Sequence, residues 1–282
     1  MEPQLALDAV GQLTDDEIDI GQAALQFARI DLPNYDLAPA RAELSALARE
    51  IVAEARAANS RTASARAGAL AALMGRHGYA GDTATYDDPA NANLIRVVER
   101  RRGLPVALGV LWLHAGRAAG WPVYGLDFPG HFLLAIGGET PPRALRPAVT
   151  SRVVVDVFAG GMPLSNADML ALLRRTHGPQ AEVHPGMLAP MPARAVLLRL
   201  QRNIQGRRSG RSDTAGALAC VEDMLRIDPD HVALWQDAAS LNTRLGRRVR
   251  ALECHSRVLE LVPDGSVARL TQRAMDELRA RS

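Results

Sequence analysis

Apolar residues in the first hundred positions recur every three or four residues, which is the spacing of amphipathic helices. Thr14 followed by Glu17 matches a capping box, a side-chain pattern that starts a helix. Pro39 suits the first position of the next helix, where its missing N–H is not needed. The pattern predicts four helices in this part of the chain, at residues 15–30, 39–55, 62–76 and 94–102.

The pattern changes after Gly103. The stretch "PVALGVLWLHAGRAAG" is apolar nearly all round, which predicts a buried helix with Pro105 in its first turn and Gly120 as its stop. Ser165 with Asp168 predicts another capped helix further on. Three runs between these helices have the composition of strands: 122–126, 131–136 and 152–158. A buried helix followed by strands indicates an α+β core with a helical N-terminal part.

The C-terminal part contains an internal repeat. Ala217 and Ala251 are 34 residues apart, and so are Pro229 and Pro263. This period is similar to that of the tetratricopeptide repeat, a pair of helices in which small residues allow close packing and a proline ends the second helix. The Pro-rich stretch 177–192 has no periodicity and is interpreted as a linker. We therefore predict two domains, 1–192 and a helical tail, 193–282.

Composition narrows the class of protein. Hydrophobic residues make up 48% of the 282 positions, enough for well-buried cores. No apolar run has the length that a bilayer requires, and the acidic start of the chain lacks the features of a secretory signal. The two cysteines, Cys220 and Cys254, match no metal-binding spacing, and His177 and His184 have no third ligand in view. We expect a cytoplasmic protein without metal, cofactor or membrane association.

Charge is uneven along the chain although the net charge is only +2. Residues 1–90 carry 7 Arg against 14 acidic residues, whereas residues 193–282 carry 16 Arg against 11. The arginine clusters at 100–102 and 207–211 lack interleaved aromatic residues and any known nucleic-acid module. We therefore expect a protein partner rather than nucleic acid.

One histidine stands out in the stretch "GLDFPGHFLLAI". His131 follows a Pro-Gly turn and begins an apolar run, which places it at the start of a strand. Asp156 ends another apolar run, and antiparallel pairing of the two strands would bring its carboxylate beside the imidazole. The two residues fit either a hydrogen-bonded structural pair, a binding site or part of a catalytic site.

The stretch "YDDPANANLIRVVERRRGLPVALGVLWLHAGRAAGWPVYGLDFPGHFLL", followed by "DVFAGG", resembles the bacterial SirB-type proteins. The resemblance implies a transglutaminase-like domain, related to papain-like cysteine proteases, followed by a tetratricopeptide-like tail. It also implies that His131 and Asp156 match two members of a catalytic triad. In that superfamily a nucleophilic cysteine begins the helix, fifteen residues before the glycine of a Gly-hydrophobic-Pro ending. Gly120 opens that ending here, and Pro105 stands at the position of the cysteine.

A proline side chain cannot attack an acyl carbon or form a thioester. Ser151 and Ser165 are near the strands in sequence, but neither begins the relevant helix. The first hypothesis is therefore a non-catalytic transglutaminase-like protein that binds a protein partner through the tail or through the cleft at His131 and Asp156. The alternative is a hydrolase or acyl transferase that uses these two residues with a nucleophile not yet identified.

Overall fold

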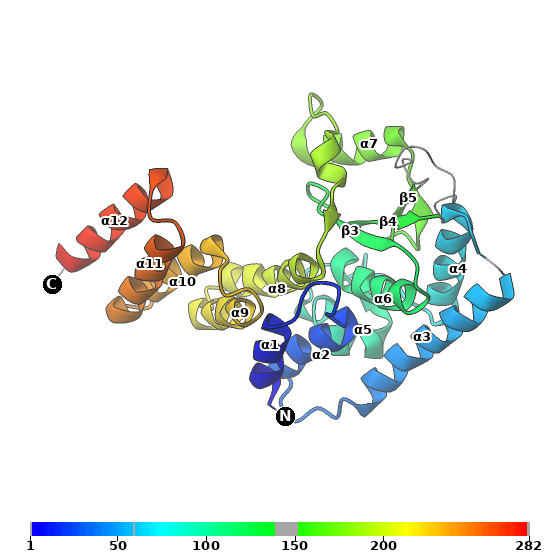
Figure 1. The fold of residues 1–282 in the computed structure, drawn as a ribbon, viewed down its shortest axis with the longest axis horizontal. Helices are drawn as coiled ribbons and strands as arrows, with labels where there is room; N and C mark the ends of the chain where they lie inside the picture. The colour runs from blue at the N-terminus through cyan, green and yellow to red at the C-terminus, as the bar shows by residue number, and fades with distance from the viewer. Residues whose placement is uncertain (1, 59, 139–151, 281–282) are drawn as a thin grey trace. The chain divides into compact units, whose positions relative to one another are not determined.

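The computed structural model describes residues 2–58, 60–138 and 152–280 (Figure 1). The chain divides into two compact units. Asp15–Leu200 forms the first, and Met1–Thr14 together with Gln201–Ser282 forms the second. The boundary falls within helix α8 (Ala193–Gly210).

The first unit is an α+β structure, which confirms the predicted fold class. Its helices are α2 (Ile20–Ile30), α3 (Ala38–Ala58), α4 (Ala63–Arg76), α5 (Leu94–Arg100), α6 (Pro105–Ala118) and α7 (Asn166–His177). Its antiparallel sheet consists of β3 (Val123–Leu126), β4 (Leu133–Gly137), β5 (Arg152–Asp156), β6 (Met162–Pro163) and β7 (Pro190–Met191), in the order β6-β5-β4-β3-β7. Short segments complete it: a parallel pair of β1 (Ala80–Gly81) and β2 (Arg102–Gly103), and 3-10 turns at Pro89–Asn91 and Pro185–Leu188.

Strand β4 lies in the middle of the sheet and is buried on both faces. Leu133 and Ala135 point to the face covered by α7, where they share a core with Met169 and Leu173. Leu134 and Ile136 alternate to the opposite face, which α4 and α6 cover (Figure 1). Helices on both sides explain why this strand reads as an unbroken apolar run rather than as an alternating one.

Most predicted helices form within two residues of their expected ends, and two predictions were wrong. The Thr14–Glu17 capping box does not form: α2 begins at Ile20, and Asp19 caps it by accepting hydrogen bonds from the N–H groups of Gly21 and Gln22. The stretch 177–192 is not a free linker, because it contributes β7 and packs Val183, Met187 and Leu188 against the core.

The second unit is helical and contains the predicted repeat. It includes α1 (Pro3–Gly11), α9 (Thr214–Ile227), α10 (Val232–Arg244), α11 (Arg248–Leu261) and α12 (Gly265–Ala280). Ala217 and Ala251 are both completely buried, and Pro229 and Pro263 each follow the end of a repeat helix by two residues. The 34-residue spacing therefore marks equivalent positions of two helical pairs.

Helix α1 was not predicted as part of the repeat unit. It packs against α9, and Asp8 Oδ1 lies 2.9 Å from Arg226 Nη1. Residues 2–14, which the sequence analysis grouped with 1–192, thus lie in one compact unit with 201–280. None of the described helices combines the length and the apolar composition that a membrane span requires.

Candidate functional site

His131 lies in a tight turn immediately before β4. Gly130 has φ +70°, a conformation that glycine adopts without strain, and the N–H of His131 donates to Phe128 O at 2.9 Å. The carbonyl of His131 accepts a hydrogen bond from Arg199 Nη2 at 2.8 Å. Because β4 begins at Leu133, the histidine precedes the strand by two residues instead of starting it.

Asp156 is the last residue of β5, and its carboxylate is fixed by the backbone that follows. Its Oδ1 accepts hydrogen bonds from the N–H groups of Phe158 at 2.9 Å and Ala159 at 3.3 Å, as in an Asx turn. The N–H of Gly161 donates to the backbone oxygen of Asp156 at 2.8 Å. The carboxylate therefore has a set orientation before any other side chain approaches it.

The structure brings these two side chains together, because β4 and β5 are antiparallel neighbours. Nε2 of His131 lies 3.1 Å from Oδ1 of Asp156, and the side chains are only 17% and 15% exposed. The ring is not aligned for a hydrogen bond, and Nε2 has no well-oriented acceptor among the described residues. The contact is thus a close approach of an imidazole nitrogen to a carboxylate oxygen without hydrogen-bond geometry.

Burial alone would raise the pKa of Asp156. The imidazole of His131 and the N–H groups of Ala159 and Phe158 outweigh it, so the pKa of the carboxyl lies below its ordinary value of 3.8. An Asp with a depressed folded pKa stabilises the fold above its unfolded pKa, and that contribution is lost as pH falls through the folded pKa.

Asp156→Asn tests this coupling, because asparagine keeps the acceptor oxygen of the turn and removes the charge. We expect the wild type to be more stable than the variant by about 1 kcal/mol at pH 7. The gap should narrow as pH falls below about 5 and close once pH lies below the lowered pKa of Asp156. Urea unfolding at a series of pH values measures it. Asp264→Asn, a change to an exposed carboxylate between α11 and α12, serves as the control. A gap that stays constant across this range would show that the charge of Asp156 does not stabilise the fold.

Helix α6 packs against the segments that carry both residues. A Cβ at Gly109 would come 2.2 Å from Cε1 of Phe132, the residue after His131, and a Cβ at Gly161 would come 2.3 Å from Cη2 of Trp112. The helix backbone at Gly109 thus lies against the ring of Phe132, and the Trp112 side chain of the same helix lies against the loop after Asp156. Pro105 is the buried first residue of this helix, and the preceding Leu104 provides no side-chain cap. The contact of the Pro105 ring with His131 stays a prediction.

An imidazole held beside an oriented carboxylate can accept, hold and return a proton. Acyl transfer additionally needs a nucleophile, and residues 15–200 contain no cysteine. Cys220 and Cys254 are buried in α9 and α11 of the other unit, and burial raises the pKa of the Cys254 thiol. The hydroxyl of Ser165 takes part in the capping box of α7 with Asp168, whereas Ser151 lies outside the described residues.

The three arginines at 100–102 all make contacts with other groups of the chain. Arg100 binds the carboxylates of Asp82 and Asp88, at 3.1 and 3.0 Å. Arg101 binds Glu43 and lies over the ring of Tyr79. The charges of Arg100 and Arg101 are thus compensated within the fold, whereas Arg102 is exposed and donates to the backbone oxygens of Gly78 and Arg101. Across the described ranges, no three His, Cys, Asp or Glu side chains converge as metal ligands would.

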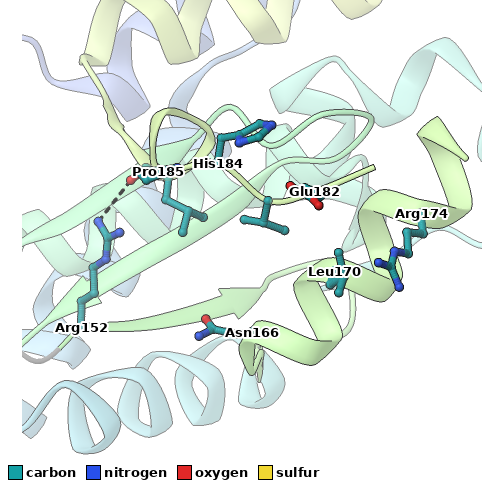
Figure 2. Close-up of a pocket in the computed structure, with 9 residues that line it drawn as sticks. Arg152, Asn166, Leu170, Arg174, Glu182, His184 and Pro185 are labelled. Atoms are coloured by element: carbon teal, nitrogen blue, oxygen red, sulfur yellow. Dashed lines mark hydrogen bonds between the residues drawn. The ribbon is translucent and has the colours of Figure 1, made fainter. Parts of the chain in front are cut away.

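A feature that the sequence analysis missed is a cavity of about 630 Å³ beside α7. Figure 2 shows the side chains around it, which come from β5, α7 and the loop before β7. One signal was available in the sequence: Asn166, Leu170 and Arg174 are spaced by four and therefore share one face of the helix. Nothing in the sequence indicated that a Pro-rich loop would lie opposite that face.

Comparison with known proteins places the two units in known families. Residues 38–202 match the transglutaminase-like superfamily, and residues 204–276 match a tetratricopeptide repeat. A UPF0162 protein of Xylella fastidiosa (strain Temecula1) is 32% identical over 195 residues, which is 68% of this chain and 66% of that protein. The chain thus spans slightly less than two thirds of that relative.

A UPF0162 protein of Pseudomonas aeruginosa is 30% identical over 87% of this chain and 84% of its own length. Among solved structures, a crystal structure of menin, whose title reports the binding site for the MLL protein, aligns with 93% of this chain and 70% of its own. Its sequence identity is 9% and its TM-score 0.42, too low a similarity to bear on the fold or function of this chain.

The match covers more than half of the chain, including the helix that begins at Pro105, the turn that carries His131 and the strand that ends in Asp156. The chain belongs to the transglutaminase-like superfamily and carries a tetratricopeptide repeat after that domain.

Proposed function

We propose that this protein is a non-catalytic member of its superfamily, of the SirB type, which acts in the cytoplasm as a protein-interaction or regulatory module. In this proposal, residues 1–192 form the transglutaminase-like domain and residues 193–282 form the repeat tail. Tetratricopeptide repeats commonly mediate protein interactions. In the described part of the chain Cys220 and Cys254 form no disulfide, which is compatible with a reducing compartment.

The observation that carries this proposal is the residue at the start of α6. In an acyl-transfer enzyme of this type, a thiolate at the helix N-terminus gains stability from the helix dipole and from a nearby imidazolium. Pro105 offers neither an ionisable group nor a lone pair at that position. His131 and Asp156 then have no thiol to activate, and a buried pair of this kind is sufficiently explained by its stabilising contacts.

The partner is proposed to be a protein, bound either by the tail or by the cleft at His131 and Asp156. The tail carries 16 Arg against 11 acidic residues, which favours an acidic protein surface. No nucleic acid is invoked, because Arg100 and Arg101 are already paired with Asp82, Asp88 and Glu43 and the cluster has no interleaved aromatic residues.

A specific observation favours the second candidate, an enzyme. The 3.1 Å contact between Nε2 of His131 and Oδ1 of Asp156 retains the base and its orienting carboxylate. Such a pair could activate a water molecule directly and hydrolyse an ester or amide without a nucleophilic side chain. This hydrolase would depend on His131 and be insensitive to thiol reagents.

A pair of assays on the purified full-length chain distinguishes the two candidates. We expect no incorporation of a fluorescent amine into glutamine-containing peptides, and no hydrolysis of an activated ester above the rate given by His131→Ala. The reason is that the first step of acyl transfer needs the thiolate that this domain lacks. Ester turnover that His131→Ala abolishes and a thiol reagent leaves unchanged would favour the hydrolase. Amine transfer that either treatment abolishes would contradict the proposal outright.

A further inference from the structure

The cavity beside α7, called here the α7 cavity, has the size of a small-molecule site. Its volume of about 630 Å³ falls within the range of pockets that hold organic ligands. Three segments enclose it: the start of β5, one face of α7, and residues 182–188 of the loop that leads to β7 (Figure 2). None of its lining residues belongs to the pair formed by His131 and Asp156.

The middle of the α7 cavity is apolar and supported from behind. Leu170, Val183 and Leu188 line it, and the last two are packed against the core between α7 and the sheet. The surface beneath a ligand would therefore be fixed by the same contacts that fold the domain. An apolar body placed here would be removed from water on one side, which favours a hydrocarbon chain over a sugar or a phosphate-rich molecule.

The two ends of the α7 cavity carry guanidinium groups. Arg152 and Arg174 lie at opposite ends, with Leu170 and Asn166 between them (Figure 2). Arg152 Nη1 donates to the carbonyl of Leu188 at 3.1 Å, and Arg174 Nε donates to the carbonyl of Ala181 at 3.4 Å. Each contact holds one N–H of the group and leaves the others available. Neither guanidinium has a carboxylate within ion-pair distance in the ranges that the structure describes.

The remaining polar side chains set the charge balance of the cavity. Glu182 supplies one carboxylate, and His184 adds an imidazole from the same loop. With the histidine neutral, two guanidiniums face one carboxylate, so the cavity has a net positive charge. Asn166 can donate to an oxygen or accept from an N–H in the middle. This balance favours an anion whose charge lies at the two ends rather than at the centre.

We propose that the α7 cavity binds a linear organic dianion with a carboxylate at each end and an apolar chain between them. A guanidinium can bind a carboxylate through two parallel hydrogen bonds, and the backbone carbonyls already restrict where the two guanidiniums lie. The hydrocarbon chain would lie over Leu170, Val183 and Leu188. The site binds the dianion and leaves it chemically unchanged. This inference does not depend on the proposed function.

Isothermal titration of the full-length chain with saturated α,ω-dicarboxylates of increasing length tests the proposal. Because the arginines stand at fixed ends, we expect affinity to rise to an optimum length and then to fall. The monocarboxylate of the optimal length should bind about tenfold or more weakly, since it loses one charge-assisted contact. The matching diol should not bind measurably. Absence of binding across the series, or affinity that only increases with length, would overturn the proposal.

Two variants identify the cavity as the binding site. Arg152→Gln and Arg174→Gln should each weaken the best dicarboxylate by about tenfold or more while leaving the monocarboxylate less affected. Arg152, Arg174 and the control residue Arg175 are all exposed, so substituting them leaves the core intact. Arg175→Gln, on the next position of the same helix and outside the cavity lining, should bind as the wild type does. Equal losses in all three variants would indicate a general charge effect and contradict the site.

Discussion

Pro105→Cys is expected to give the transglutaminase-like domain a reactive thiol. The new side chain would stand at the first position of α6, where the helix dipole favours a thiolate, and beside the predicted place of His131. We expect alkylation by iodoacetamide at pH 7 to be about tenfold faster than at an ordinary thiol, because a pKa lowered by one to two units raises the thiolate fraction by that amount.

The matched control is Ala118→Cys, which places a thiol at the exposed C-terminal end of the same helix, where the dipole opposes ionisation. Peptide mapping by mass spectrometry separates the new thiol from buried Cys220 and Cys254. Adding His131→Ala to Pro105→Cys should remove part of the acceleration. If position 105 reacted no faster than position 118, the start of α6 would not provide an accessible and activated thiol.

The second large effect is expected at Gly109. The packing of α6 against the turn of His131 leaves no room for a side chain at this position, because a Cβ would come 2.2 Å from the ring of Phe132. Gly109→Ala should therefore lower the free energy of unfolding by about 1–3 kcal/mol, since the helix must move away or the aromatic ring must leave its rotamer. Chemical unfolding followed by far-UV circular dichroism measures the change.

Gly68 provides the matched control within the same domain. It is an exposed glycine inside helix α4, and a Cβ there would meet nothing within 4 Å. Gly68→Ala should stabilise the protein by about 0.5–1 kcal/mol, because alanine loses less conformational freedom in a helix. The two substitutions are chemically the same and should have opposite signs. A Gly109→Ala variant as stable as Gly68→Ala would mean that α6 is not closely packed on the turn.

Local signals explain which parts of the fold were predictable from sequence. Helices α4 and α6 start where Thr62 and Pro105 indicate, because capping and proline geometry depend only on nearby residues. The capping box at Thr14 failed because Asp19, closer to the apolar run, caps α2 instead. Strand β7 is two residues long and includes a proline, so it has no periodicity to detect; it exists only because β3 offers an edge.

The candidate site was also predictable only where its contacts follow from local sequence or from neighbouring strands. The pairing of His131 with Asp156 follows from two adjacent antiparallel strands, because Asp156 ends β5 and His131 lies in the turn just before β4. The turn that fixes the Asp156 carboxylate depends on backbone N–H groups of the two residues that follow Val157, and no side-chain pattern reveals it. The α7 cavity depends on three segments separated by sequence, and only one of them, the α7 face, shows a recognisable spacing.

The position of α1 has a consequence for how the polypeptide is made. Helix α1 is synthesised long before the helix against which it packs, because α9 begins only at Thr214. The transglutaminase-like unit ends at Leu200 and can complete its core during synthesis, whereas α1 must wait about 200 residues for its partner. Helix α1 is thus made before the transglutaminase-like unit but packs after it, and the repeat unit cannot close until α9 has been synthesised.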